Sequence, residues 1–178
     1  MKDPALWHIH QRCKRFNGVV SPELLLVRIS SQSLTLLRNE IEVARYPVST
    51  SKNPPSCREN SFGTPTGLHR IIETIGDRQP SGMVFRGRQP IGATFSQLPP
   101  EDQRDNLITS RILRLEGLEE GLNRGPGLDS FQRYIYIHGT NHEALIGTPS
   151  SGGCVQMRNA DIIQLFPQIS IGTLVWIE

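Results

Sequence analysis

The chain has 178 residues, of which 37% are hydrophobic and 20% are charged, and it contains 16 Gly and 13 Pro. A chain of this length fits one compact domain that buries about 70% of its unfolded surface, so it forms a core without disulfides or structural metals. Its 19 basic and 17 acidic residues nearly cancel to a net charge of +2 and are scattered, which excludes an electrostatic footprint for nucleic acid or anionic lipid.

Cysteine content and the N-terminal sequence bear on the cellular compartment. Cys13, Cys57 and Cys154 match neither a zinc-binding CxxC pattern nor a disulfide framework, so at least one is a free thiol. The first 18 residues hold no apolar run suited to a signal peptide, and nowhere do about 18 apolar residues follow one another. We therefore expect a cytoplasmic protein with no membrane span, or a periplasmic one if a leader has been removed.

Short apolar stretches separated by polar turns predict mostly strands. From Leu24 to Val48 they indicate a meander of antiparallel strands. Ser49 to Gly67 is rich in Pro, Ser, Asn and Gly, which predicts a long loop of the kind that often borders a binding site. A short helical turn is expected between Gln97 and Ser110. Further strands are predicted over Leu68 to Thr74, Gly82 to Arg86, Arg111 to Leu115, Tyr134 to His138 and Thr173 to Ile177.

One segment has the pattern of a helix. It begins with Asn159 as the N-cap, carries Asp161 in the first turn, where a negative charge suits the helix dipole, and stops at Pro167. Its apolar residues recur at helical spacing: Ile162, Leu165 and Phe166. Because strands outnumber helices, the predicted fold class is mainly β.

A histidine and a cysteine carry the chemical signal. His138 ends a predicted strand, and Cys154 follows Gly152 and Gly153, 16 positions later. A thiol attacks as the thiolate and is mostly protonated at neutral pH, so a nearby imidazole must accept its proton. The two glycines can present consecutive N–H groups as an oxyanion hole. The carbonyl of Gly139 can accept a hydrogen bond from the distal ring nitrogen and fix the tautomer.

The same residues also allow a structural interpretation. Free cysteines are among the most buried residues, and a Gly-Gly-Cys turn before a helix commonly serves packing. From spacing alone, both interpretations remain open.

The segment resembles the L,D-transpeptidase catalytic domain, also called the YkuD domain. That signature is His-Gly-Thr, a variable spacer, and Ser-His-Gly-Cys-(Ile/Val)-Arg. Here the chain has His138-Gly139-Thr140 and then Ser151-Gly152-Gly153-Cys154-Val155-Gln156. The likeness runs in order from about Leu24 to the C-terminus. Other matching segments are Tyr46 to Thr50, which is similar to YPVSTG, Gly63 to Gly67, which is similar to TPTG, Arg158 to Ile162, and Gly172-Thr173.

The resemblance implies a fold and a reaction. The fold is an L,D-transpeptidase-like antiparallel β-sandwich with few short helices, in a single domain over residues 1–178 with 1–23 as an N-terminal extension. The implied substrate is a peptidoglycan stem tetrapeptide or muropeptide, cleaved between the L-centre of a diamino acid and the terminal D-Ala through a thioester, with no cofactor and no metal. Carbapenems are expected to acylate the nucleophile.

The resemblance also implies roles for individual residues. Cys154 is the nucleophile, His138 the base and Gly139 the orienting carbonyl. The oxyanion and substrate contacts are assigned to Ser151, Gly152, Gly153 and Arg158. A guanidinium binds a carboxylate bidentately, although Arg158 could instead pair with Asp161 at the surface.

Two departures from the family pattern affect the acyl acceptor. Gly152 stands where the family usually has His, and Gln156 where it usually has Arg. Since no export signal is seen, the leading hypothesis is an L,D-carboxypeptidase that uses water on muropeptides recycled in the cytoplasm. The alternatives are a periplasmic cross-linking L,D-transpeptidase, a non-catalytic peptide-binding module, and a redox sensor that pairs Cys154 with Cys57.

The remaining candidates have mainly structural interpretations. His8 and His10 could face a metal from a strand, but exposed polar roles are favoured because no further ligand is near. His142 with Glu143 is expected in a solvated loop, and His69 in the core or the cleft wall. Tyr134 and Tyr136 could line the cleft or fill the core, with packing favoured, and Trp7 and Trp176 are expected in the core or at an edge.

Overall fold

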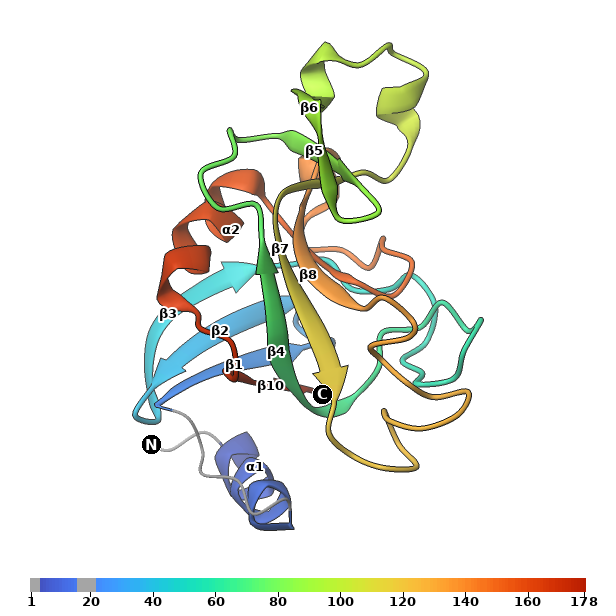
Figure 1. Cartoon of the computed structure of the whole chain (residues 1–178). Helices are drawn as coiled ribbons and strands as arrows, with labels where there is room; N and C mark the ends of the chain where they lie inside the picture. Colours follow the sequence, from blue (N-terminus) through green and yellow to red (C-terminus); the bar gives the residue numbers. More distant parts are fainter. Residues whose placement is uncertain (1–3, 16–21) are drawn as a thin grey trace.

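The computed structural model describes residues 4–15 and 22–178 (Figure 1). Residues 1–3 and 16–21 of the expected N-terminal extension lie outside the described residues. The two α-helices are α1 (Pro4–Arg15) and α2 (Asn159–Leu165). The strands are β1 (Glu23–Arg28), β2 (Ser33–Arg38), β3 (Ile41–Pro47), β4 (Gly67–Ile75), β5 (Met83–Arg86), β6 (Gln89–Thr94), β7 (Ile108–Gly117), β8 (Tyr136–Thr140), β9 (Val155–Met157) and β10 (Leu174–Ile177). Four short 3-10 turns are Phe95–Gln97, Asp102–Arg104, Glu143–Leu145 and Phe166–Gln168.

The ten described strands form one strongly bent sheet. Its order is β3-β2-β1-β10-β4-β7-β5-β6, with β8 on β7 and β9 on β8. In Figure 1 the part with β4, β7 and β8 lies in front of the part with β1, β2 and β3, and the strands of the two parts cross steeply. The mainly β, sandwich-like prediction is confirmed. Most neighbouring strands are antiparallel as predicted, and the sheet is mixed because β1 pairs with β10 and β8 with β9 in parallel.

The first three strands form the meander that the sequence predicts. β1, β2 and β3 are successive antiparallel neighbours. Asn39 and Glu40 turn β2 into β3 with φ of 49° and 65°, the positive values that a tight two-residue hairpin turn requires. Polar turn residues therefore place these strands side by side.

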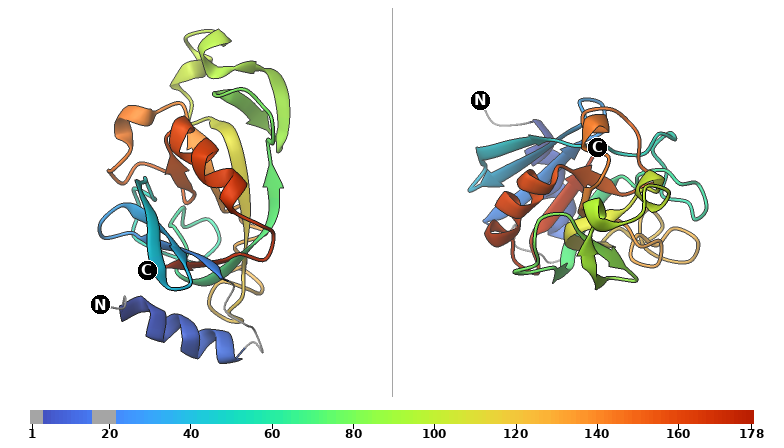
Figure 2. Two further views of the ribbon diagram at one scale, coloured as in Figure 1. Left: turned by 90° about the vertical axis from the view of Figure 1, so that its left-hand side faces the viewer. Right: turned by 90° about the horizontal axis from the view of Figure 1, so that it is seen from above.

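The main core lies between the two parts of the sheet and is closed by α2. It joins alternate apolar residues of the strands to Ile162 and Leu165 of α2, which are fully buried. Figure 2 shows α2 packed along one open side of the bent sheet. The core therefore holds the strands that carry the signature residues.

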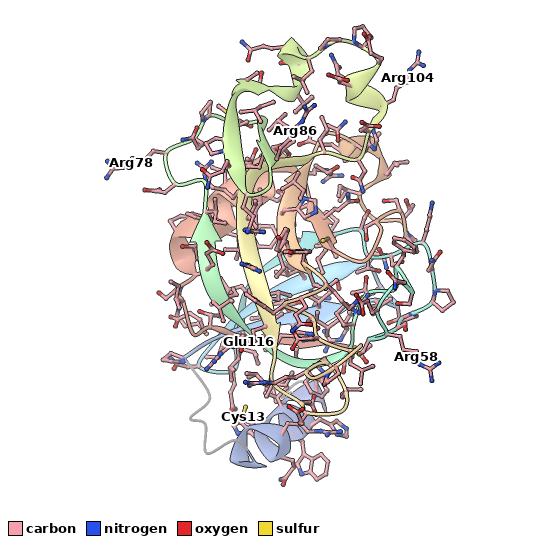
Figure 3. The ribbon with its side chains drawn as sticks, turned by 45° about the vertical axis from the view of Figure 1, so that its right-hand side comes forward. Cys13, Arg58, Arg78, Arg86, Arg104 and Glu116 are labelled. Carbon is pink, nitrogen blue, oxygen red and sulfur yellow. The ribbon has the colours of Figure 1, made fainter. Side chains whose placement is uncertain are left out.

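The helix α1 lies outside the sheet and was not predicted. Its apolar residues, Ala5, Leu6, Ile9 and Cys13, pack on the outer face of β1, β2, β4 and β10. Figure 3 labels Cys13 on the side of α1 that faces the sheet. Arg12 adds an ion pair of 2.7 Å to Glu119.

Several predictions in the N-terminal segment were wrong. His8 and His10 lie on α1 rather than on a strand. His10 Nε2 lies 2.8 Å from a carboxylate oxygen of Glu40. Trp7 is 65% exposed rather than packed, whereas Trp176 is buried as expected. No helix in the described part of the chain is long and apolar enough to span a bilayer.

Candidate active site

Parallel pairing of β8 and β9 brings the histidine and the cysteine of the signature together. Ile137 is opposite Val155, and His138 is opposite Gln156. Side chains alternate along a strand, and Ile137 and Val155 point into the main core. His138, Gln156 and the residue two positions before Gln156, Cys154, therefore share the other face. The strand β9, which was not predicted, lies between Cys154 and α2.

His138 is held as a neutral base. Its side chain is buried, and Nδ1 lies 2.7 Å from the carbonyl oxygen of Gly139. A carbonyl can only accept, so Nδ1 carries the proton and Nε2 keeps its lone pair. Burial lowers the pKa of His138 to about 4, against a smaller opposing effect of the Gly139 hydrogen bond. At neutral pH this imidazole can therefore accept a proton.

Only glycine fits at position 139. A Cβ atom there would lie 2.7 Å from the Thr109 carbonyl oxygen and 2.8 Å from Oδ1 of Asn159. The orienting carbonyl of Gly139 is thus packed tightly between β7 and the start of α2.

Asn159 joins three elements beneath that carbonyl. Its Oδ1 accepts hydrogen bonds from Thr109, at 2.6 Å, and Ser110. Its Nδ2 donates to the Thr140 carbonyl at 2.9 Å and to Glu143 at 2.7 Å. The prediction that Asn159 caps α2 was wrong by one position, because Arg158 is the N-cap and Asn159 is the first helical residue. Glu143, expected in a solvated loop, belongs to this buried network.

The surroundings of Cys154 favour the protonated thiol. Its Sγ lies 3.4 Å from the Tyr136 N–H and 3.5 Å from the Tyr134 carbonyl oxygen. Burial raises its pKa to about 11, although the Tyr136 N–H and the charge of Arg133 act in the opposite direction. Among the described hydrogen bonds none joins Sγ to His138. The pKa shifts therefore favour an uncharged thiol and an uncharged imidazole on the same face of β8 and β9.

The turn before Cys154 is tied by Ser151. The buried Ser151 hydroxyl donates to the Cys154 carbonyl at 2.6 Å and accepts from the Gly153 N–H at 3.1 Å. Gly153 has a φ of +126°, a backbone angle that residues with a side chain rarely adopt. Within the described residues, the N–H groups of Gly152 and Cys154 donate to no protein atom, so they are the free donors of the turn.

Gln156 is the second residue that departs from the family pattern, and it is buried opposite His138. Its side-chain nitrogen donates to Asn106. Its backbone exchanges two hydrogen bonds with Ser49, of 2.8 and 2.9 Å. Gln156 therefore anchors the start of the predicted long loop beside the site.

Arg133 is a residue that the sequence analysis missed. Its guanidinium donates to the carbonyls of Ser56, at 3.0 Å, and Gly63, at 2.7 Å. Burial lowers its pKa, and the nearby Cys57 and Cys154 thiols oppose that effect. No local pattern marks it, because its neighbours come from a loop about 70 residues earlier. Arg133 thus places a positive charge near Cys154 and fixes the predicted long loop.

Two hollows lie beside the turn of residues 151–154, and Arg158, in contrast to Arg133, lines neither of them. It is exposed at the N-cap of α2. Among the described ion pairs there is none between Arg158 and Asp161. Burial raises the pKa of Asp161, and the positive charge of Arg158 lowers it. The structure therefore gives Arg133, not Arg158, the position beside the thiol.

Two hollows meet at Gly152. One has a volume of about 260 Å³ and the other about 360 Å³, and Phe62 and Gly152 line both. The predicted long loop supplies much of their rims, as expected for a loop that borders a site. A Cβ on Gly152 would meet nothing within 4 Å, so the missing family histidine leaves open space. The other lining residues are Glu59, Asn60, Gln132, Arg133, Tyr134 and Ile135 of the first hollow and Lys52, Asn53, Asn106, Ser150 and Ser151 of the second.

The other residues that the sequence singled out lie outside the surroundings of His138 or serve packing. His69 is fully buried and bonded to Gly67 and Ser130, which puts it in the core. Tyr136 is packed as favoured, but Tyr134 lies before β8 with a φ of 55° and is 55% exposed, so its strand placement was wrong. All three cysteines are free. Within residues 4–15 and 22–178, no three His, Cys, Asp or Glu side chains gather where they could hold a metal ion.

Comparison with known proteins identifies the family. Residues 22–177 match the L,D-transpeptidase catalytic domain, so the chain belongs to that family. Bacillus subtilis (strain 168) YkuD, which is named as an L,D-transpeptidase, is 30% identical over 157 residues. The match covers 88% of this chain and 66% of YkuD.

Solved L,D-transpeptidases share the fold. L,D-transpeptidase 3 from Mycobacterium tuberculosis, in complex with a faropenem-derived adduct, has a TM-score of 0.55 at 14% identity over 88% of this chain and 60% of its own. An L,D-transpeptidase from Xylanimonas cellulosilytica DSM 15894 has a TM-score of 0.52 at 16% identity, over 94% and 68% of the two chains. The chain spans less than two thirds of the length of YkuD and of the M. tuberculosis enzyme.

Proposed function

We propose that the protein is a cysteine acyltransferase that acts on peptidoglycan stem tetrapeptides and works chiefly as an L,D-carboxypeptidase. The observation that carries this proposal is the neutral His138, which is oriented through Gly139 on the strand face that it shares with Cys154. Membership of the L,D-transpeptidase family supports the substrate class. The proposed donor is a soluble muropeptide undergoing recycling in the cytoplasm, as the sequence analysis expects.

The first half-reaction uses the unprotonated nitrogen of the imidazole. Nε2 of His138 accepts the proton of the Cys154 thiol while Sγ attacks the carbonyl carbon between the diamino acid and D-Ala. The carbonyl oxygen becomes an oxyanion beside the free N–H groups of Gly152 and Cys154. His138 then returns the proton to the departing amine as the C–N bond breaks. D-Ala leaves, and a thioester on Cys154 remains.

The second half-reaction transfers the acyl group to water. Water gives a proton to His138 and attacks the thioester, which releases the tripeptide and regenerates the thiol. The open space at Gly152 supports water as the acceptor, because no side chain at that position covers the thioester.

A cross-linking transpeptidase is the second candidate. The observation in its favour is the pair of hollows that meet at Phe62 and Gly152, which gives room for a donor and an acceptor peptide. An amine from a second stem peptide would then replace water in the attack on the thioester. A non-catalytic binding module is the third candidate, and the presence of both His138 and Cys154 on one strand face argues against it.

Product analysis tests the proposal. The protein is incubated with a tetrapeptide muropeptide, with and without an added amine acceptor, beside the Cys154→Ala variant as control. We expect tripeptide and D-Ala from the unmodified protein and neither from Cys154→Ala. Cross-linked dimers without tripeptide would favour the transpeptidase, and peptide binding without any product in both proteins would favour the binding module.

A further inference from the structure

The β5–β6 hairpin carries an arginine toward the site. Arg86 pairs with Gln89, and Gly87 and Arg88 form the turn with φ of 55° and 68°. Two positive φ values in a two-residue loop are typical of a tight turn that matches the twist of its strands. In Figure 1 the tip of this hairpin lies in front of β8.

Arg88 contacts the two tyrosines that also contact the nucleophile. Its guanidinium lies 3.3 Å from the Tyr136 hydroxyl, and its Cζ lies 5.6 Å from the centre of the Tyr134 ring. The backbone of these same tyrosines provides the N–H and the carbonyl nearest to Cys154 Sγ. Arg88 and the Cys154 thiol therefore contact the same two tyrosines, Arg88 through their side chains and Sγ through their backbone.

The charge of Arg88 has no carboxylate partner among the described ion pairs. Neighbouring arginines do have one, since Arg86 pairs with Asp102 and Arg114 pairs with Glu73. The direct contacts of Arg88 are a neutral hydroxyl and an aromatic ring, and the carboxylate of Glu73, which pairs with Arg114, attracts it from beyond ion-pair distance. A guanidinium with free N–H donors beside a hydroxyl is suited to bind a carboxylate.

We propose that Arg88 and the Tyr136 hydroxyl form a carboxylate-binding subsite for the acyl donor. The inference rests on the proposed function, because the carboxylate must belong to a peptide whose scissile carbonyl reaches Cys154. A stem tetrapeptide offers two carboxylates near its scissile bond: the terminal carboxylate of D-Ala, and the carboxylate at the end of the side chain of a diamino acid that carries one. In this proposal one of them binds the guanidinium while the scissile carbon lies at Sγ.

Three donor peptides distinguish the two sources. One has both carboxylates, the second has an amide in place of the side-chain carboxylate, and the third ends in D-alaninamide. Tripeptide release is measured as kcat and KM for the unmodified protein, Arg88→Gln, Arg88→Lys and the control Arg86→Gln. Arg86, labelled in Figure 3, lies on the same hairpin, and its partner is a protein carboxylate.

We expect the effect of Arg88→Gln on tripeptide release to depend on which carboxylates the donor peptide carries. Arg88→Gln lowers kcat/KM about tenfold on the donor with both carboxylates, mainly through KM, because a charge-assisted hydrogen bond is lost. Arg88→Lys recovers part of this loss, and Arg86→Gln changes little. The effect of Arg88→Gln disappears on the one donor whose amide replaces the recognised carboxylate, which identifies the source.

An equal loss on all three donors, or no loss on any, would overturn the subsite. If the unmodified protein releases no tripeptide from any donor, the proposed function fails separately. Equilibrium binding of the three peptides to Cys154→Ala, with and without Arg88→Gln, then decides the subsite. Weaker binding of the two peptides that keep the recognised carboxylate, with unchanged binding of the third, would support it, and unchanged binding of all three would refute it.

Discussion

Asn159 controls the surroundings of the catalytic base without touching the thiol. Its amide satisfies two hydroxyls of β7, the Thr140 carbonyl and the Glu143 carboxylate, and its Oδ1 lies against the Cα of Gly139. The Gly139 carbonyl in turn fixes the His138 tautomer. We assign Asn159 a positioning role in the proposed reaction.

Replacing Asn159 with Ala should lower both stability and turnover. The change removes the acceptor of the buried Thr109 and Ser110 hydroxyls and the side-chain donor to the Thr140 carbonyl, and each buried group left without a partner costs about 1–3 kcal/mol. Asn123→Ala is the control, since Asn123 is also buried and bonded to Thr66 and Leu68, but at the other end of β7. Urea unfolding and kcat are measured for both variants. Equal kcat in the two variants, at equal folded fraction, would contradict the positioning role.

At the residue scale, the sequence predicts the signature but not its tertiary neighbours. The family resemblance singles out His138, Gly139 and Cys154, and the predicted contact of His138 with the Gly139 carbonyl is present. Arg133 and Arg88 carry no local signal, because their proximity to Cys154 arises only when distant segments fold together. The catalytic roles themselves remain predictions.

At the element scale, α1 is a covering helix rather than a loose extension. Ile9 is fully buried between α1 and the sheet, and Trp7 on the same helix is 65% exposed. The helical spacing of Leu6, Ile9 and Cys13 was available in the sequence, but the alternation of His8 and His10 around Ile9 favoured a strand. Alternation over three residues is too short to separate the two periodicities.

Ile9→Ala should destabilise the protein by about 2–4 kcal/mol, because it leaves a cavity beneath α1. Trp7→Ala on the same helix should change the free energy of unfolding by less than about 0.5 kcal/mol, since its side chain is largely in solvent. Urea denaturation of both variants measures the difference. Indistinguishable midpoints for the two variants would mean that α1 does not pack on the sheet in solution.

Strands were predictable where apolar residues alternate over a long stretch. The meander of β1, β2 and β3 agrees with the sequence, including the turn at Asn39 and Glu40. β9 has only three residues, and β6 carries Pro90 and Gly92, so neither has a periodic pattern to detect. Their pairing depends on neighbouring strands supplied by the rest of the sheet.

At the scale of the whole molecule, two buried histidines make stability depend on pH. Burial lowers the pKa of both His69 and His138 from 6.5 to about 4. Between these values the unfolded chain binds more protons than the folded one, so the free energy of unfolding falls as the pH falls. Their contribution is fully present above about pH 6.5, and each histidine removes about 3 kcal/mol by pH 4.

Denaturant unfolding between pH 7.5 and about pH 5 measures the first part of this loss, above the range where most carboxylates titrate. His69→Gln should have a shallower decline across the same window, because only His138 then contributes. A free energy of unfolding that stays constant from pH 7 to about pH 5 would show that neither histidine is buried as a neutral base.

The rate at which Cys154 is acylated tests the central claim most directly. A carbapenem, the class of acylating compound that the family resemblance implies, is added, and the mass of the intact protein is followed over time. We expect one adduct, located on Cys154 by peptide mapping, and a rate at least about a hundredfold lower in His138→Ala, since general-base assistance is lost. Acylation at Cys13 or Cys57 instead, or equal rates with and without His138, would contradict the assignment of Cys154 and His138 as nucleophile and base.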